Sequence, residues 1–230
     1  MESNDFRYEH KYIIPKSLED QTLALIKSNV YKINEQYQQR RVNSIYYDSD
    51  DLILAKQNVD GNEERHKIRL RYYGDISMLN NPTLEIKSKK GYVGTKKIIS
   101  IDHNNPMYAI SNISEMDAIS NLPLSINYLS SQLKPVLLVS YVRRYFVSSS
   151  DSFRLTLDTK IIYKSIDSLI DIYSKDEIGF ISNYDSVLEI KYDVINNLNY
   201  LIGNLKLPFR LTRNSKYITG LSAIGRLQLS

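Results

Sequence analysis

The amino-acid sequence predicts an α+β protein whose main element is an antiparallel barrel or sandwich of about eight strands. Most of the 230 residues fall into segments that are rich in β-branched and aromatic side chains and that alternate between polar and apolar positions. Helical periodicity is confined to a few short stretches. The predicted strands span residues 6–14, 41–48, 66–73, 83–90, 96–101, 136–148, 153–163 and 186–192.

Three segments carry the period expected of a helix. In the first, Ser17 begins a capping box with Asp20, and apolar residues along one side predict a helix that ends near Ser28. Residues 113–121 and 194–205 show the same period more weakly. The predicted architecture is therefore an assembly of strands with a few flanking helices.

Two predicted turns join neighbouring strands. Asp60 and Gly61 precede the third strand, and residues 91–95 connect the fourth strand to the fifth. The chain has no Pro- or Gly-rich linker, no internal repeat and no low-complexity tract. We therefore expect one domain over residues 1–230.

Composition excludes several classes of site. A hydrophobic content of 42% and a charged content of 24% are typical of a soluble globular protein. The absence of cysteine excludes disulfides and thiolate metal sites, and the three histidines lack the spacing of zinc ligands. No apolar stretch approaches the roughly 20 residues of a membrane span, and the polar, acidic start does not resemble a targeting segment. We expect a cytoplasmic protein without a membrane span of its own.

Charged side chains occupy alternate positions in six predicted strands, and side chains two residues apart share one face of a strand. A single strand of this kind would simply present a solvated face. These faces, however, are dominated by Arg and Lys with single acidic residues beside them, and like charges on neighbouring strands repel. We expect them to turn inward and line a closed barrel, with the apolar faces outward under helices and loops. The charged faces hold Arg7, Glu9 and Lys11; Lys67, Arg69 and Arg71; Glu85, Lys87 and Lys89; Tyr141 and Arg143; Arg154, Thr156 and Asp158; and Glu189 and Lys191.

A lumen of this kind favours a polyanion as its ligand. Crowded buried cations carry desolvation and repulsion costs, which a chain of phosphates would relieve. Arg forms bidentate contacts with phosphate oxygens, and Lys supplies a compact point charge. The acidic residues would neutralise and orient the cations, and one of them could share a divalent metal with the phosphates.

The ordered set of charged motifs resembles the VTC domain, the polyphosphate polymerase module of the vacuolar transporter chaperone complex. That domain belongs to the triphosphate tunnel metalloenzymes, which share an eight-stranded antiparallel tunnel with the CYTH phosphatases and cyclases. The resemblance extends from about Asp5 to Gly220. The motifs are Arg7-Tyr8-Glu9-His10-Lys11-Tyr12, Ser44-Ile45-Tyr46-Tyr47-Asp48, Lys67-Ile68-Arg69-Leu70-Arg71-Tyr72-Tyr73, Leu84-Glu85-Ile86-Lys87-Ser88-Lys89, Tyr141-Val142-Arg143, Phe153-Arg154-Leu155-Thr156-Leu157-Asp158, Leu188-Glu189-Ile190-Lys191 and Ser215-Lys216-Tyr217.

The resemblance implies transfer of the γ-phosphate of ATP to the end of a growing inorganic polyphosphate chain, with ADP released. It implies Glu189 as the ligand of Mn²⁺ or Mg²⁺, and Tyr141 and Ser215 as polar residues that position phosphate. Lys89, Lys191, Glu9 and Glu85 complete the predicted substrate-binding residues. The implied phosphate-binding residues at the reaction centre are Lys11, Arg69, Arg71, Lys87, Arg143, Arg154 and Lys216.

Two departures from the wider superfamily bear on function. Related triphosphatases and cyclases open with a Glu-x-Glu-x-Lys signature, whereas Arg7 stands here in place of the first glutamate. This favours the VTC branch and a single-metal site. The eukaryotic complex also carries an SPX domain and transmembrane helices, which this sequence lacks. Phosphate sensing and coupled export therefore do not carry over, although a membrane protein could recruit the domain.

Other functions stay open at this point. The same lumen could serve a triphosphate hydrolase, in which water is the acceptor, or a module that binds polyphosphate without catalysis. Nucleic-acid binding is disfavoured, because the tyrosines are spread through the strands and the expected lumen is too narrow for a duplex.

A few further polar residues are expected to play structural parts. His10 alternates with Glu9 and Lys11 and should lie on the outside, and His66 and His103 are predicted at the surface. Asp48 is predicted in a solvated turn or as a helix N-cap.

Overall fold

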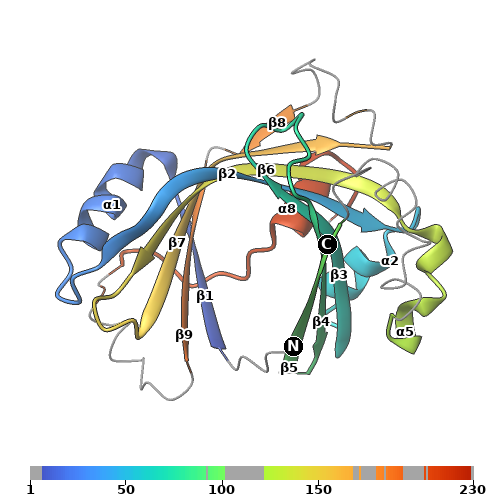
Figure 1. Ribbon diagram of the computed structural model, residues 1–230, viewed down its shortest axis with the longest axis horizontal. Helices are drawn as coiled ribbons and strands as arrows, with labels where there is room; N and C mark the ends of the chain where they lie inside the picture. The colour runs from blue at the N-terminus through green and yellow to red at the C-terminus, as the bar shows by residue number, and fades with distance from the viewer. Residues whose placement is uncertain are drawn as a thin grey trace.

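The computed structural model describes residues 7–91, 93–101, 122–167, 171, 180–183, 185–193, 205 and 207–228. They build one antiparallel sheet with the order β1-β9-β7-β6-β2-β3-β4-β5, and β8 pairs with β7 beside this path. The sheet curls so that β1 and β9 face β3 and β4 across its middle (Figure 1). The strands are β1 Arg7–Ile14, β2 Asn34–Asp48, β3 Glu64–Tyr73, β4 Thr83–Lys90, β5 Val93–Ser100, β6 Lys134–Val147, β7 Phe153–Ser165, β8 Phe180–Asn183 and β9 Ser186–Asp193.

The predicted fold class is confirmed, and the structure refines how the sheet ends. Within the described residues, β1 and β5 are its two edges, so the barrel is curled rather than closed by hydrogen bonds. β2 begins at Asn34 instead of near residue 41, because a polar, exposed stretch without alternating burial still pairs with β6. The four residues of β8 were too few to show a sequence period.

The helices differ more from the prediction. The first consists of η1 Lys16–Leu18 and α1 Glu19–Lys27, and no side chain caps it within the described residues, so the capping box is wrong. Glu19 instead accepts a local hydrogen bond from Lys16 and a tertiary one from Ser186 of β9. The acidic first turn of α1 therefore binds the helix to the sheet. The two weaker helical predictions, at 113–121 and 194–205, lie outside the described residues except for Leu205. The unpredicted short helices are α2 Ile53–Val59, α5 Leu124–Asn127, η3 Ser130–Gln132 and α8 Lys216–Ala223.

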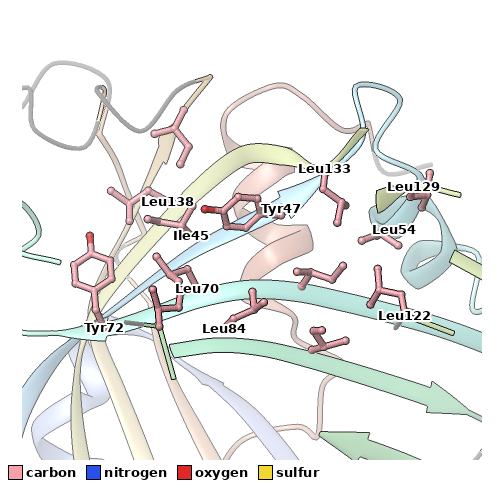
Figure 2. Packing of buried hydrophobic residues seen from close by; sticks show 14 of the residues in the cluster. Ile45, Tyr47, Leu54, Leu70, Tyr72, Leu84, Leu122, Leu129, Leu133 and Leu138 are labelled. Carbon is pink, nitrogen blue, oxygen red and sulfur yellow. The ribbon is translucent and has the colours of Figure 1, made fainter. Parts of the chain in front are cut away.

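Two of the three apolar clusters lie on the outer face of the sheet beneath helices and loops, as predicted. One cluster covers β2, β3 and β4, where Leu54 of α2 packs on the strands (Figure 2). A second covers β7 and β9, where Ile26 of α1 joins Leu155 and Ile190. The charged faces are therefore left to the inside of the curl. Figure 2 labels Ile45, Tyr47, Leu54, Leu70, Tyr72, Leu84, Leu122, Leu129, Leu133 and Leu138 of the first cluster.

Two polar residues that were expected at the surface are buried. Asp48 is fully buried and accepts hydrogen bonds from the backbone N–H groups of Leu54 and Ala55 and from the Tyr217 hydroxyl. It thus satisfies the start of α2, as an N-cap would, but away from solvent. His66 is also buried, and its Nδ1 lies 2.9 Å from Ser88 Oγ on the outer face. His10 lies outside the curl beside Tyr192, as predicted, and His103 is outside the described residues.

Helix α8 lies inside the curl of the sheet (Figure 1). Tyr217 and Leu221 of this helix pack with Val139 and Tyr163 in a third apolar cluster. Gly220 permits this approach, because a Cβ there would lie 2.7 Å from both Leu137 Cδ2 and Tyr163 Cδ1. The sequence did not predict this inner helix, which places Lys216 beside Asp158 of β7.

Replacing Gly220 with alanine is expected to lower the free energy of unfolding by about 1–2 kcal/mol, because overpacking outweighs the helix propensity gained. Urea denaturation measures the change. Ser222→Ala, on the same helix, serves as the control and should stay within about 0.5 kcal/mol of the wild type. A Gly220→Ala protein as stable as Ser222→Ala would contradict the close approach of α8 to the sheet.

Candidate functional site

Strands β1 and β9 bring two carboxylates and two amines together on the inner face. Their register places Lys11 opposite Glu189, and Glu9 opposite Lys191. Lys11 Nζ lies 2.6 Å from Glu9, and Lys191 Nζ lies 2.7 Å from Glu189. Burial would raise the pKa of Glu189, but Lys191 and Lys11 lower it far below its usual range. Glu189 is therefore an anion at neutral pH.

A second cluster forms on β3, β4 and β5 around Glu85. Arg69, directly opposite Glu85 in the sheet, donates to it from Nε at 2.8 Å, and Lys96 donates at 2.8 Å. Arg71 Nη1 lies 3.4 Å away. Burial opposes ionisation of Glu85, yet these cations lower its pKa to about 2. A single carboxylate thus orients three cations, and Tyr46 Oη accepts a further bond from Arg69 at 3.2 Å.

The third cluster surrounds Asp158 of β7, whose side chain is fully buried. Arg143 of β6 donates two hydrogen bonds to it, at 2.6 and 2.7 Å, and Lys216 Nζ lies 2.5 Å away. Burial would raise the pKa of Asp158, but Lys216 and Arg143 lower it. The carboxylate therefore holds the first residue of α8 against the sheet and fixes both cations.

Cations outnumber carboxylates on this inner face. Lys67, Lys87 and Lys89 enter no ion pair with any residue that the structure describes. Lys67 Nζ instead donates to Ser215 Oγ at 2.9 Å. The three carboxylate clusters leave a surplus of positive charge, which an anion in the lumen would neutralise.

Some polar atoms of the inner face are buried and have no hydrogen-bond partner within the described parts of the chain. They include Ser44 Oγ, Arg71 Nε and Thr156 Oγ1. Ser44 lies opposite Arg71, and Thr156 lies opposite Glu189. An unsatisfied buried polar group costs about 1–3 kcal/mol. A ligand with several oxygens in the lumen would relieve this cost.

The three clusters and the surplus lysines unite most of the site residues that the sequence analysis named. Tyr141 is buried, and its ring lies 5.2 Å from the Arg143 guanidinium and 4.8 Å from Lys216 Nζ, where it supports both cations. The predicted residues on the inner face are Glu9, Lys11, Arg69, Arg71, Glu85, Lys87, Lys89, Tyr141, Arg143, Glu189, Lys191, Ser215 and Lys216.

Arg154 lies apart from these clusters. It shares a strand face with Thr156 and Asp158, but about half of its side chain is exposed, and its nearest ion-pair partner is Asp151 at 3.5 Å. Its role in phosphate binding stays a prediction. Arg7 begins β1, and its side chain lies outside what the structure describes.

Four residues of the clusters were absent from the predicted site. Lys67 and Asp158 already lay on the charged strand faces, so strict use of the alternation would have included them. Lys96 lies opposite Lys87 across β4 and β5, a pairing that only the register reveals. Tyr46 lies in one of the motifs of the resemblance, but it carries no charge and was assigned no role.

The donor set on β1 and β9 fits a hard divalent cation that is shared with a ligand. No group of three or more His, Cys, Asp or Glu side chains gathers among the described residues. Mg²⁺ is commonly held by one or two carboxylates together with substrate phosphates. Glu189 is ionised and faces the lumen, and the unpartnered Thr156 Oγ1 lies opposite it. These features fit a single cation held by Glu189 and phosphate oxygens.

The curled antiparallel sheet with its predominantly cationic inner face defines the class of fold to which this chain is compared. Two solved structures share the fold. A candidate adenylate cyclase from Vibrio parahaemolyticus matches with a TM-score of 0.52 at 13% identity, covering 94% of this chain and 99% of the other. HpAC1 from Hippeastrum, described as revealing a dominant triphosphatase activity, matches with a TM-score of 0.55 at 15% identity, covering 99% and 98%.

The chain belongs to the VTC domain family, whose model matches residues 6–224. A search of curated proteins gives no match. Family and fold together support a function in polyphosphate or triphosphate chemistry.

Arg154 offers a test of the inner face that spares the fold. Charge reversal, Arg154→Glu, is expected to weaken tripolyphosphate binding at least tenfold, with the midpoint of urea denaturation nearly unchanged, because the side chain is half exposed. Calorimetric titration measures the affinity. The control is Lys97→Glu, an exposed lysine paired with Ile86 of the outer cluster. Equal affinities of the two variants would remove Arg154 from the phosphate-binding face.

Proposed function

We propose that this protein is a polyphosphate polymerase that transfers the γ-phosphate of ATP to a growing polyphosphate chain inside the lumen. The observation that carries the proposal is the surplus of cations on the inner face, beyond those that Glu85, Asp158, Glu9 and Glu189 hold in ion pairs. An array of this extent can contact several phosphates of a linear polyanion at once, whereas a single phosphate group would contact only part of it.

The side chains of the lumen would act by alignment and charge neutralisation. Arg69, Arg71 and Arg143 are already oriented by carboxylates, so little reorganisation is needed when phosphates bind. An oxygen of the terminal phosphate forms a bond to the γ-phosphorus of ATP, while the bond from that phosphorus to the β,γ-bridging oxygen breaks and ADP leaves. No covalent protein nucleophile is needed.

Glu189 would hold the divalent cation, Mn²⁺ or Mg²⁺, which supplies further neutralisation of phosphate charge when bound. Lys11 and Lys191 flank this carboxylate and keep it ionised. Lys216 and Ser215, at the start of α8, would also bind phosphate oxygens, since Lys216 lies beside Asp158 of β7 and Ser215 beside Lys67 of β3.

A triphosphate hydrolase is the second candidate. The sheet is curled and not closed, and the side chains of Lys87 and Lys191 remain exposed to solvent. Water could therefore reach the same phosphates and replace the chain end as acceptor. The Hippeastrum neighbour with its described triphosphatase activity shares the fold that permits this.

Incubation of the purified protein with ATP and Mn²⁺, seeded with short polyphosphate, distinguishes the candidates when the products are resolved on a gel. A ladder of lengthening chains with equivalent ADP is the expected result. Release of orthophosphate without longer chains would contradict the polymerase and support the hydrolase. Tight tripolyphosphate binding without turnover would contradict both enzymes and support a module that binds polyphosphate without catalysis.

We further propose that the protein works in the cytoplasm, where it draws on ATP, and that a membrane protein recruits it. None of the helices in the described stretches of the chain combines the length and the apolar character required to cross a bilayer. Fractionation of cells under low and high salt would test both proposals, because a recruited protein moves from the membrane pellet to the soluble fraction as salt rises.

A further inference from the structure

Lys67 of β3 and Lys87 of β4 are directly opposite each other on the inner face of the sheet. Like charges at such a cross-strand position destabilise a sheet. Every other Arg or Lys discussed for the three clusters has a carboxylate within ion-pair distance, whereas neither Lys67 nor Lys87 has one among the described residues. Lys67 and Lys87 are therefore two opposed amines that lack an ion-pair partner among the described residues.

Further groups surround Lys67 from three sides. Lys11 and Glu9 face it from β1, Lys87 from β4, and Arg69 from its own strand. Burial and the three neighbouring cations lower the pKa of Lys67 to about 7, and Glu9 opposes this shift only in part. In the free protein, the amine is thus partly neutral at physiological pH.

Ser215 fixes the direction of this amine. Lys67 Nζ donates to Ser215 Oγ at 2.9 Å, and Ser215 directly precedes α8, whose Lys216 is anchored to Asp158. The contact joins residues 148 positions apart. Lys67 is therefore held toward the lumen by the same helix that carries a predicted phosphate-binding cation.

We propose that Lys67 is a further substrate-binding residue, which forms a subsite for one phosphate group with Lys87 and Lys11 and takes up a proton from solvent when that group binds. The inference rests on the proposed function, since it concerns the same lumen. A phosphate between the two opposed amines replaces their repulsion by attraction to a shared anion, which favours the charged form of Lys67. The neutral amine gains one proton and no other bond changes.

Calorimetric titration of the protein with tripolyphosphate at pH 8, in two buffers of different ionisation enthalpy, tests the proton uptake. The wild type is expected to take up close to one proton more than Lys67→Arg, because arginine is charged at every accessible pH. Between pH 6 and pH 8, the charged fraction of a group with a pKa near 7 falls about tenfold. The affinity of the wild type relative to Lys67→Arg should fall by the same factor, and ionisation of the ligand cancels in this ratio.

Lys97→Arg, on the outer face of β5, is the matched control and should behave as the wild type. Lys67→Met gives a second test: its affinity should be at least tenfold lower than that of the wild type at pH 6 and should lack the added proton uptake. If Lys67→Arg showed the proton uptake and pH dependence of the wild type, the role of Lys67 would be wrong while the proposed function would stand. Lys67→Met serves the same purpose if the arginine variant fails to fold. A wild type that does not bind tripolyphosphate at any pH would overturn the proposed function, and this inference with it.

Discussion

Replacing Asp158 with asparagine is expected to remove about 3–5 kcal/mol from the free energy of unfolding. The side chain is fully buried between Arg143 and Lys216, so loss of its charge leaves two cations without a compensating carboxylate. A loss of this size is a large fraction of the 5–15 kcal/mol that is typical of a folded domain. Urea denaturation at pH 7 measures it, and the same variant should bind tripolyphosphate more weakly because α8 is no longer anchored.

Glu35→Gln is the matched control for Asp158→Asn. Glu35 also accepts two hydrogen bonds from one guanidinium, that of Arg144, at 2.9 and 2.7 Å. This pair is partly exposed, and such pairs contribute about 0–1 kcal/mol. The two variants therefore compare the same bidentate carboxylate–guanidinium pair in a buried and in a partly exposed position. If both lost less than 1 kcal/mol, Asp158 would not be the anchor of α8.

Glu189→Gln should reduce metal-dependent turnover by at least about 100-fold, in the range found when one preorganised electrostatic group is removed from an active site. Tripolyphosphate binding without metal should be equal or tighter, because the change removes a negative charge from the lumen. Lys191 is half exposed, so its charge remains solvated in the variant. Rates measured across a Mn²⁺ titration, beside calorimetric affinities, separate the two effects.

The role of Glu189 as a metal ligand would be wrong if the variant and the wild type had equal metal-stimulated rates. Glu35→Gln again provides the control, since it makes the same chemical change outside the lumen, where Arg144 packs on Phe146 of the outer apolar cluster. A rate loss shared by both variants would point to destabilisation and not to metal binding.

Much of the sheet and of the site could be predicted because alternation is a local property. In β3, the pattern Lys67-Ile68-Arg69-Leu70-Arg71 assigns each side chain to one face, whatever the partner strand is. Repetition of the pattern in other strands then implied an inner charged face. His66 was expected at the surface because the sequence shows no partner for it, yet it follows the same alternation, lies on the apolar face and is buried there beside Ser88.

The capping box at Ser17 failed for a different reason. Its signal depends on a local hydrogen bond, but the first turn of α1 is bound by a tertiary contact, in which Glu19 accepts from Ser186 of β9, and by a local bond from Lys16. Tertiary packing overrides such weak local preferences. Helix α8 was not predicted either. Its few apolar residues are too short a pattern to indicate a helix by themselves, and their role is seen only in their packing on the inner face of the strands.

The strands, their two faces and the cationic character of the inner face were thus determined by the order of residues along each segment, because a period of two assigns the side chains to a face. The contacts of the charged side chains were decided by the tertiary structure. The path of α8 brings Ser215 to Lys67, and the register of β6 and β7 brings Asp158 to Arg143. These contacts form between segments far apart in the chain, and no local period encodes which segments meet. Packing of the inner helix against the sheet, made possible at Gly220, selects them and leaves Lys67 and Lys87 without a carboxylate.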